Sequence, residues 1–572
     1  MGRFTADFET CDKTERGDGV RVWAWAICSI DEPEKFWTGT SIETFLEWIG
    51  NAGGGTFYFH NLKYDGRYLV DYFLNHNWSY VDKKPRRTRE FTTLISSMGA
   101  WYSISCLIWS RAEKRLVRVT FLDSMKLLPM KVADVAEAFE LDEGKGELDY
   151  ETFRPVGHQL TDEEEDYIRR DVQIMAKALH ICIIDEGMDR MTIGSNALAS
   201  WRKGFPAWKS MFPKLGNVCD RQIREAYRGG FTYCMPEFRD VDVYDGISLD
   251  FNSMYPSMMI GKKFPFGEPI YFEGQYTYDE WAPLFVQHVL VSWTLKESGI
   301  PFLNPSVHGI FHEAEYPAVV DEPVEMWLTN IDFELMDLMY DYDVWAWYDG
   351  WKFNVRDGKD FFGEYVSYWG SRKEQSTGPR RMIAKLYLNN LYGKFATRED
   401  NEMKVPYYHL RKHHVVYRTE PSRSTETVYI PIAVFCTAYA RDTLLRAAMA
   451  NRDRFIYCDT DSLHLLGTEP PEGIPIDDKK LGHWKIEGRF HHARHLRAKT
   501  YAWDLNGKFD VICAGMPENI KERVTWENFH LGFSNCDENG NIIPGMGKLL
   551  ARTVDGGAEL YEGKFELRGQ IV

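Results

Sequence analysis

The sequence FIYCDTDSLH at residues 455–464 contains two runs of strand-forming side chains separated by Asp-Thr-Asp. Aromatic and β-branched residues favour strands, whereas Asp and Thr favour turns, so this stretch predicts a β-hairpin with Asp459 and Asp461 at its tip. In isolation, an Asp-Thr-Asp turn is common in surface loops. A catalytic interpretation therefore depends on the other polar motifs in the chain.

A second acidic strand is predicted within ISLDFNSMYP at residues 247–256. Apolar and polar side chains alternate here, so Asp250 is expected on the face opposite its apolar neighbours. Pro256 is expected to stop the strand, because proline cannot donate a hydrogen bond to a neighbouring strand. Asp250 would then lie near the strand end, with Tyr255 just beyond it.

The sequence RMIAKLYLNNLYGKF at residues 381–395 predicts an amphipathic helix. Its apolar stripe would contain Ala384, Leu388, Leu391 and Phe395, and its polar face Lys385, Asn389 and Tyr392. A lysine suits the phosphates of a nucleoside triphosphate, and a tyrosine suits the base pair being formed. The alternative is an ordinary amphipathic helix whose lysine extends into solvent.

The N-terminal sequence FTADFET at residues 4–10 also alternates, which places Asp7 and Glu9 on one face of a predicted strand. Another strand, predicted at residues 57–59, is followed directly by the polar segment HNLKYDG. Polar residues after a strand end are where α/β proteins commonly place their chemistry. The candidates in this segment are Asn61, Tyr64 and Asp65.

A helix is predicted from Thr161 to Leu179, because Thr161 and Glu164 match a capping box and apolar residues recur at helical spacing. Tyr167 and Asp171 lie four residues apart and hence on one face. Asp171 would join the three acidic residues above, and such carboxylates repel one another unless cations lie between them. Two divalent ions such as magnesium would resolve this repulsion, and Tyr167 would orient the attacking water.

In chain order, DFET, HNLKYD and YIRRD resemble the three exonuclease motifs of the DEDD proofreading domains attached to family B DNA polymerases. Further along, DFNSMYP, KLYLNNLYG and YCDTDS resemble polymerase motifs A, B and C of that family. The resemblance implies an α+β multidomain protein, with an RNase H-like α/β 3′→5′ exonuclease domain followed by a palm, fingers and thumb. It also implies two Mg²⁺ or Mn²⁺ ions at each active site.

The resemblance implies roles for individual residues. In the polymerase part, the metal ligands would be Asp250, Phe251 and Asp461, with Asp459 as their catalytic neighbour. The incoming nucleotide would contact Tyr255, which excludes a ribose 2′-hydroxyl, and Lys373, Arg381, Lys385, Asn389 and Tyr392. DNA would contact a Y-x-G-G motif (Tyr227, Arg228, Gly229, Gly230) and a K-x-Y motif (Lys499, Tyr501). In the exonuclease part, the metal ligands would be Asp7, Glu9, Asp65 and Asp171, and the strand end would contact Thr10, Asn61 and Tyr64.

Within family B, the sequence is most similar to the protein-primed DNA polymerases of small phages. The chain is short for the family, the spacing between motifs A and B is long, and a second insertion separates motifs B and C. This branch implies a priming terminal protein, primer-template and single-stranded DNA, and deoxynucleoside triphosphates as partners. It implies a monomer that replicates a linear viral genome processively, with strand displacement, in the cytoplasm of an infected host cell. One departure is Asn390, which stands where a serine is expected.

The motifs divide the chain into segments. These are an exonuclease domain (1–189), palm segments (190–261 and 429–533), insertions resembling terminal-protein regions 1 and 2 (262–358 and 397–428), fingers (359–396) and a thumb (534–572). Residues 187–214, rich in Gly, Ser, Trp and Pro, are predicted to connect the exonuclease domain to the rest.

The composition, with 44% hydrophobic and 15% aromatic residues, is typical of a folded soluble enzyme. No window has the ~18 apolar residues of a membrane span, and the first residues lack a signal-peptide core. The ten cysteines are scattered, which favours reduced thiols and argues against zinc. The net charge of −17 argues against nucleic-acid binding, although metal-binding carboxylates contribute to it and basic runs occur at residues 83–89 and 489–499.

Four alternatives remain open at this point. A DEDD nuclease could carry a C-terminal part that only grips nucleic acid, or a non-catalytic scaffold could retain a polymerase fold. The intact acidic residues argue against the scaffold. A polymerase that uses or makes RNA is disfavoured by Tyr255 and by the exonuclease motifs. A family B polymerase primed only by nucleic-acid ends differs from the favoured interpretation in its primer alone.

Overall fold

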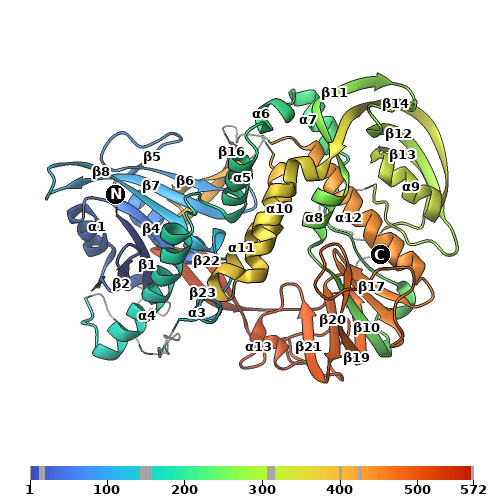
Figure 1. The fold of residues 1–572 in the computed structure, drawn as a ribbon. Coiled ribbons are helices and arrows are strands. Elements are labelled where there is room, and N and C mark those ends of the chain that lie inside the picture. Colours follow the sequence, from blue (N-terminus) through green and yellow to red (C-terminus); the bar gives the residue numbers. More distant parts are fainter. Residues whose placement is uncertain are drawn as a thin grey trace.

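The computed structural model describes residues 2–11, 20–141, 148–149, 152, 154, 157–305, 316–398, 402–422 and 428–568. A sheet built from the N-terminal part (blue in Figure 1) and a second sheet built mainly from the C-terminal part flank a pair of long central helices. The predicted fold class, an α/β exonuclease-like domain followed by a mixed α+β polymerase hand, is confirmed by this arrangement.

The N-terminal domain is built on an eight-stranded sheet with strand order β3-β2-β1-β4-β8-β7-β6-β5. Strand β1 lies between β2, its antiparallel neighbour, and β4, its parallel neighbour. The strands are β1 (Arg3–Cys11), β2 (Arg21–Ser29), β3 (Phe36–Gly39), β4 (Gly55–Phe59), β5 (Ser79–Tyr80), β6 (Glu90–Ile95), β7 (Trp101–Ser110) and β8 (Arg115–Asp123). The helices of this domain are α1 (Ile42–Asn51), α2 (Leu62–Asn75), α3 (Val132–Ala138) and α4 (Asp162–Leu179).

Helix α4 begins where the sequence predicts. The Thr161 hydroxyl accepts a hydrogen bond from the Glu164 backbone N–H, and the Glu164 carboxylate accepts one from the Thr161 backbone N–H, which completes the capping box. The helix packs on β1 and β2, and the Thr5 hydroxyl donates to the Val172 carbonyl at 2.8 Å. This contact fixes the position of α4 along β1, and therefore the position of the neighbouring Asp171 relative to the sheet.

The segment 187–214, predicted as a connector, is largely helical. It contains α5 (Ile193–Gly204) and α6 (Trp208–Met211). Trp201 is buried among four phenylalanine rings, and its indole N–H donates to the Phe361 carbonyl at 2.9 Å. Burial of an aromatic side chain outweighs the weak helix propensity of the surrounding Gly and Ser residues. The segment therefore forms part of the support for the central helices.

The palm is a seven-stranded sheet with strand order β21-β20-β19-β10-β18-β17-β9. Its strands are β9 (Thr232–Cys234), β10 (Asp242–Phe251), β17 (Phe455–Asp459), β18 (Ser462–Leu466), β19 (Trp484–Arg497), β20 (Thr500–Leu505) and β21 (Lys508–Cys513). The helices α7 (Asn217–Arg224), α8 (Met254–Gly261), α12 (Pro431–Ala450) and α13 (Glu518–Lys521) lie in the part of the chain that follows the N-terminal domain. The predicted hairpin at residues 455–464 is confirmed as β17–β18.

One strand boundary differs from the prediction. Strand β10 ends at Phe251, and Pro256 lies inside α8 rather than at the strand end. The chain turns earlier because Ser253 adopts a left-handed conformation with φ of 55° before the helix begins. Pro256 is tolerated there because the first turn of a helix does not use its backbone N–H groups.

The central helices are α10 (Gly358–Gln375) and α11 (Gly378–Phe395), drawn in yellow in Figure 1. The predicted apolar stripe of α11 is confirmed, because Ala384, Leu388, Leu391 and Phe395 are all buried. Asn390, at the position where a serine is expected, turns back and donates to the Leu386 carbonyl of its own helix.

The two predicted insertions form separate sheets. The first contains β11 (Lys263–Glu273), β12 (Leu284–Leu295), β13 (Val319–Thr329), α9 (Asn330–Met339) and β14 (Tyr340–Asp357). The second is the hairpin β15 (Glu402–His409) and β16 (His414–Pro421). The C-terminal hairpin, β22 (Lys548–Val554) and β23 (Gly557–Gly563), returns to the N-terminal domain, where the Tyr68 hydroxyl donates to the Ala558 carbonyl at 2.5 Å.

Among the helices described, none is both long and apolar enough to cross a bilayer.

Candidate active sites

A cavity of about 660 Å³ lies between the palm sheet and the central helices. It collects nine residues that the sequence predicts for nucleotide and metal binding: Asp250, Phe251, Tyr255, Lys373, Arg381, Lys385, Asn389, Tyr392 and Asp461. Residues 250–255 come from the β10–α8 junction, and the cations come from α10 and α11. Ala138 of the N-terminal domain also lines the cavity, so both halves of the chain contribute to it.

The two acidic strands meet at this cavity. Strands β10 and β18 pair side by side, with Asp250 opposite Ser462, and the Phe251 N–H donates to the Asp461 carbonyl at 2.8 Å. Burial, together with the negative charges of Asp250 and Asp459, raises the pKa of Asp461 to about 6. Two carboxylates that repel in a half-buried position form a natural ligand pair for a divalent cation.

Lys485 is a residue of this cavity that the sequence analysis missed. It lies directly opposite Asp250 in the β10–β19 pair, and its Nζ is 2.9 Å from Asp250 Oδ2. Glu487, two residues further along β19, also lines the cavity. No local motif marks these residues, but a cross-strand pairing of β10 with β19 would have identified them.

Asp459 occupies a different position from the other two aspartates. Both of its oxygens accept hydrogen bonds from Lys499 Nζ at 2.9 Å, and Oδ1 also accepts one from the Thr232 hydroxyl at 2.8 Å. The Lys499 backbone N–H donates to the Tyr457 hydroxyl, whose ring packs against Tyr501. Asp459 therefore joins the hairpin tip to the predicted primer-binding turn rather than facing the cavity.

The opposite wall of the cavity is cationic and aromatic. The rings of Tyr255 and Tyr392 stack with centroids 3.7 Å apart. Burial lowers the pKa of Lys373, and the nearby charges of Arg381 and Lys385 lower it further. Cations held this close together favour a multiply charged anion such as a triphosphate.

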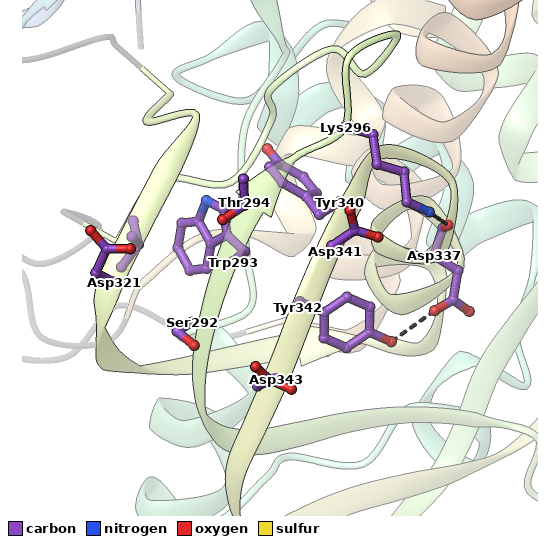
Figure 2. Close-up of a pocket in the computed structure, with 11 residues that line it drawn as sticks. Ser292, Trp293, Thr294, Lys296, Asp321, Asp337, Tyr340, Asp341, Tyr342 and Asp343 are labelled. Atoms are coloured by element: carbon purple, nitrogen blue, oxygen red, sulfur yellow. Dashed lines mark hydrogen bonds between the residues drawn. The ribbon is translucent and has the colours of Figure 1, made fainter.

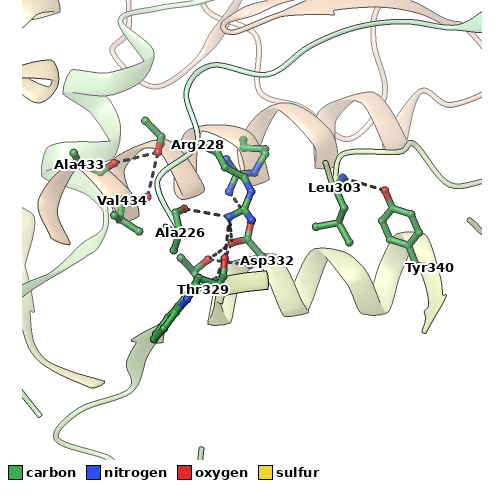
Figure 3. Close-up of polar contacts among 11 residues, drawn as sticks. Ala226, Arg228, Leu303, Thr329, Asp332, Tyr340, Ala433 and Val434 are labelled. Atoms are coloured by element: carbon green, nitrogen blue, oxygen red, sulfur yellow. Dashed lines mark hydrogen bonds and ion pairs between the residues drawn. The ribbon is translucent and has the colours of Figure 1, made fainter. Parts of the chain in front are cut away.

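The Y-x-G-G segment is only partly available to DNA. The guanidinium of Arg228 points into the protein, where it donates to the carbonyls of Ala226 and Trp327 and lies 3.9 Å from the buried carboxylate of Asp332 (Figure 3). This differs from the predicted DNA contact, because a buried arginine must satisfy its N–H groups and charge within the fold. A Cβ on Gly230 would lie 2.5 Å from the Thr460 hydroxyl, so glycine is required beside the hairpin tip. Tyr227 is half buried near Tyr392, and Gly229 has open space around it.

A second, smaller cavity of about 180 Å³ lies in the N-terminal domain. Its lining includes the predicted residues Asp7, Asn61, Tyr64, Asp65 and Asp171. Burial, followed by the charges of Asp7 and Glu9, raises the pKa of Asp65 well above its ordinary value. The Thr10 and Tyr64 hydroxyls lie 2.6 Å apart at the edge of this group. Glu9 and Tyr167 are buried, at 8% and 4% exposure, and are not among the residues that line the cavity.

Asp123 is a supporting residue that the sequence analysis missed. It ends β8 and accepts hydrogen bonds from the backbone N–H groups of Asn61 and Leu62 at 3.1 and 3.4 Å. Asn61 has a φ of 83°, so the carboxylate of Asp123 holds a left-handed turn in place at the start of α2. Asp65 lies in the first turn of that helix, and Asp123 therefore positions it.

The donor sets of both cavities fit divalent metal ions. In the part of the chain that the structure describes, no three acidic, His or Cys side chains are gathered as tightly as in a preformed metal site. Burial raises the pKa values of both Asp461 and Asp65, and neighbouring carboxylates raise them further, so each cavity holds more than one acidic side chain. A divalent ion would relieve this repulsion, because hard oxygen donors are what Mg²⁺ and Mn²⁺ prefer.

A palm sheet with paired carboxylates, a facing cationic helix and a second acidic cavity are together typical of nucleotide-polymerising enzymes with an attached nuclease domain. The family model "DNA polymerase type B, organellar and viral" matches residues 51–156 and 145–479. The chain therefore belongs to the type B DNA polymerases of organelles and viruses, and it is a DNA polymerase.

Phage relatives support this membership over the whole chain. The DNA polymerase of Bacillus phage Nf is 38% identical over 99% of this chain and 99% of its own. That of Bacillus phage phi29 is 38% identical over 93% of this chain and 94% of its own. The structure of phi29 DNA polymerase complexed with primer-template DNA superposes with a TM-score of 0.90 at 36% identity, covering 99% of this chain and 100% of that one. The predicted similarity to the phage branch of family B is confirmed.

Proposed function

We propose that this DNA polymerase adds deoxynucleotides to a primer end by a two-metal mechanism in the larger cavity. The observation that carries the proposal is the convergence of Asp250 and Asp461 opposite Lys373, Arg381 and Lys385. Two Mg²⁺ or Mn²⁺ ions held by these aspartates and the Phe251 carbonyl would activate the primer hydroxyl and neutralise the leaving pyrophosphate. The related phi29 enzyme has been observed with primer-template DNA and incoming nucleotide substrates, which supports the same partners here.

The chain's own residues would position the reactants. The cations of α10 and α11 bind the triphosphate, and the stacked pair Tyr255 and Tyr392 forms the floor under the sugar and base. Stacking against Tyr392 holds the Tyr255 ring in place. The fixed ring would occupy the position of a ribose 2′-hydroxyl, so that ribonucleotides are excluded. The Lys499 turn, fixed by Asp459, would hold the primer end.

We propose that the smaller cavity removes mispaired nucleotides by 3′→5′ hydrolysis. Asp7, Glu9, Asp65 and Asp171 would hold the metals, and Thr10, Asn61 and Tyr64 would contact the strand end. The raised pKa of Asp65 supports the proposal, since it marks a site where negative charge accumulates. The relative from phage phi29 has also been observed with single-stranded DNA.

We further propose that synthesis is primed by a protein and that the polymerase is a monomer. The first insertion has a depression of about 540 Å³ whose lining includes Asp321, Asp337, Asp341 and Asp343 (Figure 2). Such a surface suits a basic patch on a partner protein. The second insertion and the C-terminal hairpin, both packed on the N-terminal domain, would enclose DNA and support processive, strand-displacing replication of a linear viral genome. Because the relatives are phage DNA polymerases, we propose that replication takes place in the cytoplasm of an infected cell.

The test is primer extension on a primed single-stranded circle with magnesium and deoxynucleotides, using the wild type, Asp461→Ala and Asp7→Ala. Asp461→Ala should lose synthesis and keep digestion, and Asp7→Ala should do the reverse. Loss of both activities in each variant would contradict two separate sites. Protein priming is tested by following the transfer of a labelled deoxynucleotide to a phage protein in place of a DNA primer.

A further inference from the structure

Lys485 makes an ion pair with a proposed metal ligand. Its Nζ lies 2.9 Å from Asp250 Oδ2, and its side chain is 35% exposed. The contact is a direct cross-strand pair between β10 and β19, so the backbone register holds the two side chains together. An oxygen that accepts a hydrogen bond from an ammonium group cannot use the same lone pair for a metal ion, and the two cations would repel each other.

The surroundings of Lys485 offer its ammonium group other partners. Lys485 lines the same cavity as Lys373, Arg381 and Lys385, which are the cations proposed to bind a triphosphate. Glu487 also lines it and accepts a hydrogen bond from the Ser248 hydroxyl at 3.2 Å. When a divalent ion occupies Asp250, Lys485 can therefore turn toward the phosphates without leaving the cavity.

The charges of the cavity explain why a lysine is useful at this position. Asp459 is already paired with Lys499, whereas Asp250 and Asp461 lie on neighbouring strands and both line the cavity. Burial lowers the pKa of Lys485, but the hydrogen bond to Asp250 and the charges of Asp250, Glu487 and Asp461 raise it above its ordinary value. The ammonium group is thus the cation that balances the aspartate pair in the metal-free protein.

We propose that Lys485 is a built-in counter-cation of the polymerase site, which a divalent ion must displace from Asp250 and which then contacts the triphosphate of the incoming nucleotide. This inference rests on the proposed metal-binding function of the cavity. Because a bound nucleotide gives the released lysine a multiply charged partner in addition to Glu487, metal and nucleotide binding become coupled, and each strengthens the other. Lys485 would thereby restrain metal binding at a cavity that holds no nucleotide.

The test measures Mn²⁺ binding to the full-length protein without DNA, by electron paramagnetic resonance. Asp7→Ala and Asp65→Ala are present throughout, so that the smaller cavity does not contribute. In this background Lys485→Met should bind Mn²⁺ about two- to fivefold more tightly, the effect expected when a partly exposed competing ion pair is removed. Its gain in Mn²⁺ affinity on adding a deoxynucleoside triphosphate should be smaller than that of the parent protein. Lys485→Arg should retain the parent affinity, and so should Lys508→Met on the exposed end of β21.

The outcomes separate this inference from the proposal on which it rests. Unchanged or weaker Mn²⁺ binding by Lys485→Met, with a normal melting temperature, would mean that Lys485 is only a cross-strand contact and would overturn the inference. Asp461→Asn in the same background should lose the Mn²⁺ site. If it kept that site, the proposed metal-binding function of the cavity would be wrong. If it lost the site while Lys485→Met behaved like the parent protein, only the role of Lys485 would be rejected.

Discussion

The two carboxylate sites differ in the groups that surround their acidic side chains. In the larger cavity a lysine pairs with Asp250, and the pKa of Asp461 rises to about 6. In the smaller cavity Asp65 is buried beside Asp7 and Glu9, and its pKa is raised well above the ordinary value, with the main lowering influence coming from backbone hydrogen bonds. Lys485 pairs with a carboxylate at the larger site, whereas burial and two neighbouring carboxylates raise the pKa of Asp65 at the smaller site.

This difference corresponds to what each site must admit. The larger cavity, at about 660 Å³, has room for a nucleoside triphosphate and for a side chain that can exchange partners. The smaller cavity, at about 180 Å³, is suited to the end of a single strand and leaves less room for a mobile cation. The two activities should therefore respond differently to the loss of a carboxylate at one site and to the loss of a primer contact.

The largest effects are expected from removing the charge of one proposed metal ligand at either site. Asp461→Asn should reduce nucleotide incorporation by more than the roughly 10- to 100-fold that loss of an outer-sphere partner costs a metal site. Asp7→Asn should reduce digestion of single-stranded DNA to the same degree. Each change preserves side-chain size and removes one negative charge.

Initial rates of extension and of digestion, measured on the same preparations, check this prediction. The matched control is Asp459→Asn, which should impair extension less than Asp461→Asn does, because Asp459 is paired with Lys499 outside the cavity. Equal losses in Asp459→Asn and Asp461→Asn would remove the distinction drawn between the two hairpin aspartates.

The next effect tests the turn at Lys499, which is proposed to hold the primer end. Lys499→Met breaks the hydrogen bonds to both oxygens of Asp459, and bonds to charged groups contribute about 1.5–3 kcal/mol. Extension of a primed template should fall about tenfold, while digestion of single-stranded DNA should stay near the wild-type rate. A parallel fall in both activities would indicate damage to the whole fold, and the melting temperature would show this directly.

The sequence predicts the features that depend on neighbouring residues and misses those that depend on residues far apart in the chain. The β17–β18 hairpin and the cap of α4 depend on a few adjacent residues, and both are found where expected. Lys485 and Asp123 were missed because each acts on a residue from another strand or helix, and only the sheet register or the packing shows which one. Arg228 was assigned to DNA from its motif, but its partner Asp332 lies in an insertion about a hundred positions away.

A smaller effect is expected from pH. A carboxyl group must lose its proton before it can bind a metal ion, so stabilisation by Mg²⁺ should weaken as the pH falls through the pKa of the ligand. The larger site should lose this stabilisation as the pH falls through about 6, the pKa of Asp461. The smaller site should also lose it in acid, because burial and neighbouring carboxylates raise the pKa of Asp65 above its ordinary value. Thermal melting of Asp461→Asn and Asp7→Asn, with and without Mg²⁺, isolates one site in each protein.

The sign for the metal-free protein is opposite. A carboxyl group whose folded-state pKa is raised destabilises the fold when it is ionised, so its contribution improves as the pH falls from above about 6 toward the ordinary value near 4. As the pH falls, Mg²⁺ stabilises the protein less, and the protein without Mg²⁺ becomes more stable. Both changes should reduce the Mg²⁺-induced rise in melting temperature. A Mg²⁺-induced rise that stayed constant between about pH 7 and about pH 5 in Asp7→Asn, which retains the larger site, would contradict the raised pKa of Asp461.

The smallest expected effect concerns the scaffold of the smaller site. Thr161→Ala removes the side chain that caps α4, and the loss of such a cap typically costs about 1 kcal/mol of folding free energy. Asp171 lies more than two turns further along the helix, where the Thr5–Val172 contact fixes its level. Digestion should therefore stay near the wild-type rate although the melting temperature falls.

Thr419→Ala, at an exposed position on β16, is the matched control and should leave both the digestion rate and the melting temperature unchanged. A large loss of digestion in Thr161→Ala would show that the helix start, rather than its packing on β1, positions Asp171.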